Sequence, residues 1–379
     1  MTACAIEPAA PAAPNTAPST APTAPTAAGT AFAIAADGSY AARLAGDGEA
    51  RFPERWTLGG PEPYAVPLPL GQPEEADSGL LALADGRVLI HRRVAGRHAF
   101  ALLYPTGAAA GPRTGELPLG GIEAADYTGL TLLPPAPDGR GTFALAARAD
   151  ATEVWQITGA GTGPRQAAVV PGRCSGGVWL DRAGGLLALD REQDGRTKAV
   201  AVDLGRGGEV SPLLQIAEDS DDRLLLADPD SGLLLIRSDA PGEPRLGWGV
   251  LGSARPVRFP ECLREEGAAA VPFAVQPGQI LMPENCAVAL CLDGGRLGLW
   301  RPADRYLFRL GAPVGWLGGT GMWTREGVLR LPYATADVPC GVVNLTVPQA
   351  PPEVRFVPPP AAPAAPRPIP LQQAPLTCG

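Results

Sequence analysis

The chain has 379 residues and a formal net charge of −8, with an isoelectric point of about 5.0. This acidic balance excludes the basic footprint of a general nucleic-acid-binding protein. Two histidines and seven irregularly spaced cysteines without a CxxC pair make a zinc site or a disulfide framework unexpected. We expect a cytoplasmic protein with reduced thiols, because no secretory signal and no apolar run of membrane-spanning length is evident.

Two composition-biased ends flank the part of the chain that we expect to fold. Residues 1–30 are nearly all Ala, Pro and Thr, and residues 358–379 are rich in Pro and Ala. Such segments bury too little apolar surface to offset the conformational entropy lost on folding. We therefore predict a disordered arm over 1–30, one folded domain over 31–357 and a disordered tail over 358–379.

Short apolar runs separated by turn residues fill the middle of the chain, a pattern typical of antiparallel β-strands. The clearest hairpin joins residues 80–84 to residues 87–90 through Asp85-Gly86, a dipeptide that favours the backbone of a tight turn. Such turns recur roughly 45 to 53 residues apart, the spacing of propeller blades. They lie at Asp37-Gly38, Asp85-Gly86, Asp138-Gly139, 182–185, 230–232, Pro277-Gly278 and 325–327.

A second turn follows each first turn at a steady offset. These second turns lie at Asp47-Gly48, Gly96, Asp150, Asp194-Gly195, Pro241-Gly242, Asp293-Gly294 and Asp337. Two interleaved series give four strands per unit; in the fourth unit we expect them at 177–181, 186–190, 197–203 and 209–215. The sequence thus predicts an all-β fold, a seven-bladed β-propeller of four-stranded antiparallel blades. Either residues 353–357 or the arm near Thr30 would complete the last blade.

The third and fourth strands of the units resemble those of known propellers. Residues 198–204 lead through glycines into 209–214, and residues 298–301 lead into 305–310. This pattern is similar to the repeats of TolB-like propellers and of prolyl-oligopeptidase propellers. The second resemblance implies an appended α/β-hydrolase domain, but the sequence has no G-x-S-x-G motif. Neither Ser175 nor Ser253 has the glycine pair that such a nucleophile requires, so we expect no catalytic residue and no cofactor.

Three smaller motifs admit both a functional and a structural interpretation. His91 and His98 flank a basic hairpin, which could contact an anion; we favour an ordinary solvated turn, because nothing nearby completes a catalytic set. The Asp228–Gly232 hairpin could bind calcium, but Asp and Gly are also what any tight turn selects. We expect no metal there. Cys286 and Cys291 are predicted to be buried thiols.

Charge separates by loop type along the predicted blades. The blade-to-blade connections carry more negative charge than the whole chain, whereas the opposite face collects arginines, among them Arg87, Arg182 and Arg301. A surface of one sign steers oppositely charged partners. The candidate binding face comprises the acids of these connections and the glycine-flanked Trp316: Glu74, Glu75, Asp77, Glu123, Asp126, Glu218, Asp219, Asp221, Asp222, Glu261, Glu265, Glu266 and Trp316.

Two functions remain open at the level of sequence. The first is a non-catalytic, monomeric scaffold that binds a protein partner, with a basic segment of the partner at the acidic face and with neither nucleic acid nor membrane involved. The alternative is a propeller enzyme or small-ligand binder, a hydrolase or lyase acting on sugars or peptides, with a site in the central channel. Fold alone does not decide between them. We expect the remaining tryptophans to pack between blades.

Overall fold

The computed structural model describes residues 32–107, 113–123, 127, 129–159, 161, 163–264, 270–278 and 282–346. The predicted arm, the predicted tail and the strand expected at 353–357 lie outside these residues. The described part consists of β-strands with four short 3-10 helices, at Leu204–Arg206, Glu261–Leu263, Pro283–Asn285 and Asp293–Gly295. No helix in this part of the chain is long and apolar enough to cross a membrane.

Three four-stranded sheets open the chain, each an antiparallel meander in sequence order. The first holds β1 (Ala33–Ile34), β2 (Tyr40–Ala45), β3 (Phe52–Thr57) and β4 (Tyr64–Pro67). The second holds β5 (Gly79–Ala82), β6 (Val88–Val94), β7 (Arg97–Thr106) and β8 (Arg113–Glu123). The third holds β9 (Gly129–Leu132), β10 (Thr142–Ala147), β11 (Ala151–Thr158) and β12 (Arg165–Pro171).

The second half begins with a seven-stranded sheet made of two meanders. Its strands are β13 (Arg173–Trp179), β14 (Leu186–Gln193), β15 (Arg196–Asp203), β16 (Glu209–Pro212), β17 (Asp222–Ala227), β18 (Leu233–Ser238) and β19 (Arg245–Val250). A single parallel pair, Lys198 with Asp222, joins β15 to β17. The fifth sheet holds β20 (Val271–Val275), β21 (Val288–Leu292), β22 (Arg296–Trp300) and β23 (Phe308–Leu310), and the sixth holds β24 (Met322–Trp323), β25 (Val328–Tyr333) and β26 (Gly341–Thr346).

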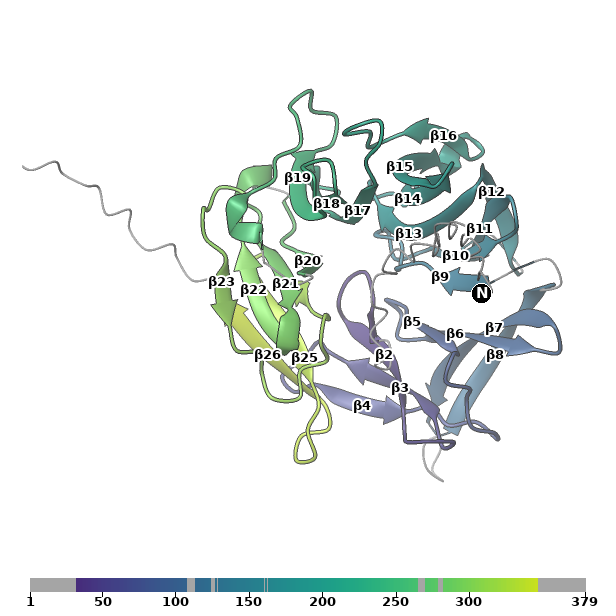
Figure 1. Cartoon of the computed structure of the whole chain (residues 1–379). Helices are drawn as coiled ribbons and strands as arrows, with labels where there is room; N and C mark the ends of the chain where they lie inside the picture. Colours follow the sequence, from purple (N-terminus) through teal and green to yellow (C-terminus); the bar gives the residue numbers. More distant parts are fainter. Residues whose placement is uncertain are drawn as a thin grey trace, which may run out of the picture.

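The sheets follow one another around a common axis, which is the arrangement of a β-propeller (Figure 1). Both predicted series of turns are confirmed, because each turn lies between two consecutive strands of one sheet. Gly86, for example, has φ of 82°, which favours glycine. The prediction for the inner strand of the fourth unit is wrong at its start: β13 begins at Arg173 and passes through a bulge between Ser175 and Val178. The bulge contains Gly176 and Gly177, and two adjacent glycines in a sequence indicate a turn, so the sequence predicts a strand that begins only at Gly177.

Apolar side chains fill the spaces between neighbouring sheets. Phe143 on β10 packs edge to face on Trp179 on β13, in a core shared by the third and fourth sheets. Trp300 is fully buried in the core between β17–β19 and β20–β23. The prediction that tryptophans pack between blades is therefore confirmed at these positions. Burial of rings this large is among the strongest contributions to stability in such a core.

Side chains also tie neighbouring sheets together through hydrogen bonds to backbone carbonyls. Arg55 donates to the carbonyl of Gly86 (3.2 Å), and the Trp179 indole donates to that of Pro134 (3.0 Å). Because each bond crosses from one sheet to the next, it fixes the rotation of one meander against its neighbour. Arg182 and Asp230, from first-hairpin turns of adjacent meanders, form an ion pair with the same effect.

The ring closes between the first and last sheets by side-chain packing. Phe32 and Trp56 share a core cluster with Leu317, Ala334 and Val342. Arg330 on β25 donates to the carbonyl oxygen of Leu58, which follows β3. In the described ranges, no strand of β1–β4 pairs with a strand of β24–β26. Figure 1 shows β2–β4, in purple, beside the yellow β25 and β26.

Candidate functional site

The predicted acidic face comes from connections that share one end of the meanders. Four antiparallel strands return the chain to the side on which it entered. After the three-stranded meander β17–β19, the segment at Arg258 that bridges to Trp248 makes this return. The connections between meanders therefore lie on the same face as the second-hairpin turns. Some of the acids on these connections face solvent, whereas others form hydrogen bonds or ion pairs within the protein. Asp126, Glu265 and Glu266 lie outside the described residues.

Asp222 is an internal anchor of its connection. Its side chain is fully buried and accepts hydrogen bonds from the Lys198 ammonium (2.8 Å), the Ser220 and Ser238 hydroxyls (2.9 and 2.7 Å) and the Ile216 backbone N–H (2.9 Å). Burial raises the pKa of this carboxyl, but these hydrogen bonds outweigh burial and hold it below its usual value. Asp222 therefore fixes the shape of the loop and is not accessible to a ligand.

Two further predicted acids are also occupied within the fold. Glu74 is buried and forms a two-pronged ion pair with Arg92, with both N–O distances at 2.8 Å. Asp221 accepts the Thr197 backbone N–H at 2.7 Å. Bidentate and backbone contacts of this kind position a loop. Neither carboxylate is thus free in the way that a docking surface requires.

Four predicted acids are exposed and lack an ion-pair partner among the described residues: Glu75, Asp77, Glu218 and Asp219. Glu218 and Asp219 project from the connection that Asp222 anchors. Two more, Glu123 and Glu261, are exposed but paired, the first with Arg97 (2.8 Å) and the second with Arg245 (2.9 Å) and Arg264 (3.2 Å). Exposed pairs of this kind are weak, so they compete little with an incoming cation.

Trp316 is a half-buried core residue. Its ring lies 5.5 Å from that of Phe273, and its indole N–H donates to the Thr320 carbonyl at 2.8 Å. Both the apolar face and the polar atom of this side chain therefore have partners within the protein. Trp316 lies on the connection between β23 and β24. Its ring is used for packing within the protein and is not presented as a flat surface for a ligand.

Some of the arginines predicted on the opposite face have carboxylate partners there. Arg87 pairs with Asp85 (2.6 Å), Arg301 with Asp304 (3.5 Å), and Arg182 with Asp230. Asp85 and Asp304 come from the same turns as their arginines, and Asp230 comes from a turn of the neighbouring meander, so a count of arginines alone overlooks them. The opposite face is therefore less basic than the sequence indicates.

The predicted solvated turn lies at residues 93–97, which are exposed, but the two histidines that flank it are buried inside the fold. His91 and His98 are both buried, and the Nε2 atom of His91 lies 2.8 Å from the Nδ1 atom of His98. That hydrogen bond needs one protonated and one unprotonated nitrogen, which favours neutral rings. Burial, with a smaller contribution from His98, lowers the pKa of His91 from 6.5 to about 4, and Asp77 opposes this shift.

Stability should therefore fall as the histidine pair is forced to ionise. An unfolded chain protonates His91 near pH 6.5, whereas the folded protein does so near pH 4, so stability is present above 6.5 and is lost as the pH falls toward 4. We expect His91→Phe to remove about 1–2 kcal/mol of the loss between pH 7 and pH 5. Urea unfolding of the unaltered protein and of His91→Phe at pH 7 and pH 5 measures the two losses of stability. An equal loss in the two proteins would contradict the prediction.

An unpredicted charged cluster lies where β13–β16 meet β17–β19. Buried Asp190 on β14 accepts the Leu224 backbone N–H (3.0 Å), and Arg223 lies 3.8 Å from its carboxylate while donating to the Thr197 hydroxyl (3.1 Å). Burial raises the pKa of Asp190 to about 6, against the opposing effect of Leu224 and Arg223. Such a shift is typical of catalytic acids, but these contacts use the carboxylate to join two meanders.

The Asp228 turn is likewise held by its own hydrogen bonds. The Asp228 carboxylate accepts from the backbone N–H and hydroxyl of Ser231 (2.9 and 2.6 Å) and from the backbone N–H of Gly278 (2.9 Å). Among the residues with a described placement, no three His, Cys, Asp or Glu side chains form a group that could hold a metal ion. Cys286 is a buried thiol, as predicted, whereas Cys291 is only half-buried.

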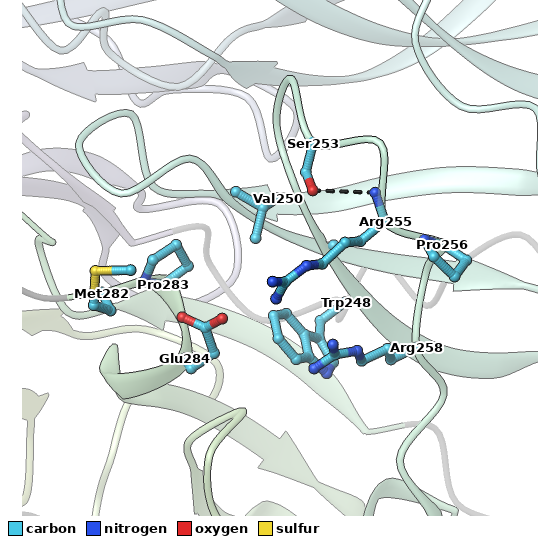
Figure 2. Close-up of a pocket in the computed structure, with 10 residues that line it drawn as sticks. Trp248, Val250, Ser253, Arg255, Pro256, Arg258, Met282, Pro283 and Glu284 are labelled. Carbon is cyan, nitrogen blue, oxygen red and sulfur yellow. Dashed lines mark hydrogen bonds between the residues drawn. The ribbon is translucent and has the colours of Figure 1, made fainter.

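A cavity of about 330 Å³ opens on the face opposite the acidic connections. Trp248 on β19 lines part of it, and Arg258 lies over the Trp248 ring with its guanidinium carbon 5.1 Å from the ring centroid. Arg255 comes from the loop after β19, and Glu284 from the 3-10 helix before β21. Figure 2 shows both guanidinium groups beside the Trp248 ring, with Glu284 across from them.

Comparison with known proteins places this geometry among solved propeller structures. No protein-family model and no curated protein matches the sequence. Oligogalacturonate lyase from Vibrio parahaemolyticus is 11% identical, with 84% of this chain and 89% of that one aligned at a TM-score of 0.51. Prolyl oligopeptidase B from Galerina marginata, bound to a hydrolysis and macrocyclization substrate, is 12% identical. The alignment covers 84% of this chain and 49% of that one, at a TM-score of 0.50. TolB from Acinetobacter baumannii is 11% identical, and the alignment covers 83% of this chain and 82% of that one at a TM-score of 0.43.

These likenesses define the class of the protein and nothing finer. The chain is a β-propeller that resembles prolyl-oligopeptidase propellers, as its repeats predict. It spans about half the length of prolyl oligopeptidase B. At 11 to 12% identity the similarity shows the fold alone, so activity and ligands have to be argued from this chain's own residues.

Proposed function

We propose that this chain is a non-catalytic interaction scaffold, which binds a basic segment of a protein partner at its acidic connections. The observation that carries the proposal is the set of exposed carboxylates on one face: Glu75, Asp77, Glu218 and Asp219. Asp222 and Glu74 hold two of these connections in shape, so the exposed acids are presented from fixed loops. Presentation from fixed loops reduces the ordering cost of binding.

A cationic segment is the chemistry that this face would recognise. Exposed carboxylates of one sign raise the local concentration of cations and speed association, and they penalise acidic partners. The paired acids Glu123 and Glu261 can exchange their weak surface contacts for contacts with such a segment. We propose that the protein does this as a monomer in the cytoplasm.

We further propose that the ring has seven blades. The seven-stranded sheet counts as two blades in this interpretation, because only the Lys198–Asp222 pair joins its two meanders. The second meander, β17–β19, gains a short outer segment through the antiparallel bridge between Trp248 and Arg258. With these assignments each blade contains one turn of the first series and one turn of the second series.

The alternative, an enzyme or small-ligand binder with a site in the central channel, has less support. It calls for carboxylates and an exposed aromatic side chain that converge on the axis. Trp316 has partners for both its ring and its N–H, and Asp190 is committed to Leu224 and Arg223. These uses of the two side chains favour the scaffold.

Charge reversal of the two exposed acids beside Asp222 tests the scaffold. We expect Glu218→Lys/Asp219→Lys to weaken binding of a fluorescent lysine homopeptide by about tenfold at low salt, because opposite charges become like charges. Binding by the unaltered protein should also weaken steeply as salt is added. Fluorescence anisotropy measures both effects.

A matched control separates the face from net charge. Glu209→Lys/Glu326→Lys makes the same change in charge with exposed acids of the opposite face, at the start of β16 and in the β24–β25 turn. The proposal requires this variant to bind the peptide nearly as well as the unaltered protein. Equal weakening in the two variants would show that the peptide senses only the overall charge.

A further inference from the structure

We infer that the cavity beside Trp248 is a binding site for a small aromatic acid, a flat molecule with one carboxylate at one end and a hydrogen-bond donor at the other. The site lies on the face opposite the acidic connections and outside the central channel. It is independent of the scaffold proposal, because neither its residues nor its test involves Glu218 or Asp219.

Two arginines without carboxylate partners define the anionic end of the ligand. Within the part of the chain that the structure describes, neither Arg255 nor Arg258 forms an ion pair, whereas Arg87, Arg182 and Arg301 on the same face each have one. The planar guanidinium fork matches a carboxylate through two parallel hydrogen bonds. Figure 2 shows the Arg255 and Arg258 guanidinium groups beside the Trp248 ring.

The walls of the cavity define a flat apolar body. Trp248 is 5% exposed and contributes only a strip of its surface to the cavity, with the Arg258 guanidinium over its ring; Val250, Pro256 and Pro283 supply apolar walls. Aromatic rings prefer offset or edge-to-face contact with an indole, and arginine planes stack on such rings. The volume of about 330 Å³ falls at the lower end for small-molecule sites, which suits one or two fused rings.

Glu284 defines the far end of the ligand. Its side chain lies across the cavity from the arginines, on a 3-10 helix whose backbone is held by the hydrogen bond from Ala303 N–H to the Glu284 carbonyl (2.8 Å). A carboxylate there accepts a hydrogen bond from a hydroxyl or amine and repels a second negative charge. It therefore selects monoanions over dianions, including phosphate monoesters near neutral pH.

The loop that carries Arg255 is preorganised for this role. The Ser253 hydroxyl accepts the Arg255 backbone N–H at 3.2 Å, and Trp248 and Arg258 exchange backbone hydrogen bonds at 2.8 and 3.0 Å. These contacts hold both arginines on the rim of the cavity before any ligand arrives. A preformed site loses less conformational entropy on binding.

Three naphthalenes of matched shape test the inference with the full chain. We expect 6-hydroxy-2-naphthoate to bind at least about tenfold more tightly than 2,6-dihydroxynaphthalene, which lacks the anion, and than naphthalene-2,6-dicarboxylate, which places a second anion at Glu284. Isothermal titration calorimetry at constant ionic strength measures the three affinities. Equal affinities, or no binding of 6-hydroxy-2-naphthoate, would overturn the inference.

Single substitutions then assign the two ends of the site. Arg255→Gln and Arg258→Gln should each weaken 6-hydroxy-2-naphthoate by about tenfold, and Arg325→Gln, an exposed arginine of the same face, should leave its affinity unchanged. Glu284→Gln should remove the discrimination against the dicarboxylate. Weakening by Arg325→Gln equal to that of the other arginines, or discrimination that persists in Glu284→Gln, would show that the cavity is not the site.

Discussion

Replacement of Asp222 with alanine is expected to lower the free energy of unfolding by about 3–5 kcal/mol. The substitution leaves the Lys198 ammonium without its carboxylate, and it removes the acceptor for the Ile216 N–H and for the Ser220 and Ser238 hydroxyls. A half-buried charge and several donors then lose their partner at once, and each costs desolvation free energy. Urea unfolding at neutral pH measures the change.

Two comparisons make this prediction specific. Asp219→Ala removes an exposed acid from the same connection and should change the stability by less than about 0.5 kcal/mol. Lys198→Met/Asp222→Ala should recover part of the loss, because no uncompensated ammonium remains. If Asp219→Ala were as destabilising as Asp222→Ala, the connection would not depend on the Asp222 network.

The contribution of Asp222 also has a defined pH dependence. Because its folded pKa lies below the unfolded value of 3.8, its stabilising effect is complete above that value and is lost as the pH falls through the folded pKa. The His91 contribution is lost at higher pH, between 6.5 and about 4. The two effects therefore appear in successive pH ranges of one acid titration.

Trp56→Ala is expected to destabilise the protein by about 3–5 kcal/mol and to act mainly at the joint between the first and last sheets. The ring is fully buried, meets Phe32 edge to face at 5.0 Å, and lies under the Arg43 guanidinium at 4.8 Å. Its loss leaves a cavity in the cluster that holds β3 against β25 and β26. Hydrogen exchange should show reduced protection chiefly in β1–β3 and β25–β26.

Two other substitutions calibrate that result. Trp56→Phe keeps an aromatic ring and loses the indole hydrogen bond to Glu54 (2.7 Å), so its cost should be smaller. Trp179→Ala removes a ring of the same size between the third and fourth sheets and should reduce protection there instead. An identical exchange pattern for Trp56→Ala and Trp179→Ala would mean that the joint has no separate weakness.

The architecture could be predicted because it is encoded locally. A turn such as Asp85-Gly86 carries its own backbone preference, and its repetition sets the length of each unit without reference to the rest of the fold. The bulge in β13 escaped prediction for the same reason, because glycines at 176 and 177 favour a turn locally while pairing with β14 continues around them. Tertiary pairing overrides local preference there.

The roles of individual acids could not be predicted in the same way. Asp219 and Asp222 belong to one connection, yet only Asp222 meets Lys198, which lies 24 residues earlier in the chain. The histidine pair depends on the register of β6 and β7, which brings two rings of one hairpin together inside the core. The cavity combines Arg255 with Glu284 from different sheets, so no single segment signals it.

The joint between β1–β4 and β24–β26 has a mechanical consequence. Among the described strands, none is shared across this joint, so the two sheets can part there without losing any ladder hydrogen bond. Separation anywhere within a meander would break such bonds. A radial load on the disc is therefore carried at this joint by the packed cluster around Trp56 and by the hydrogen bond from Arg330 to the Leu58 carbonyl.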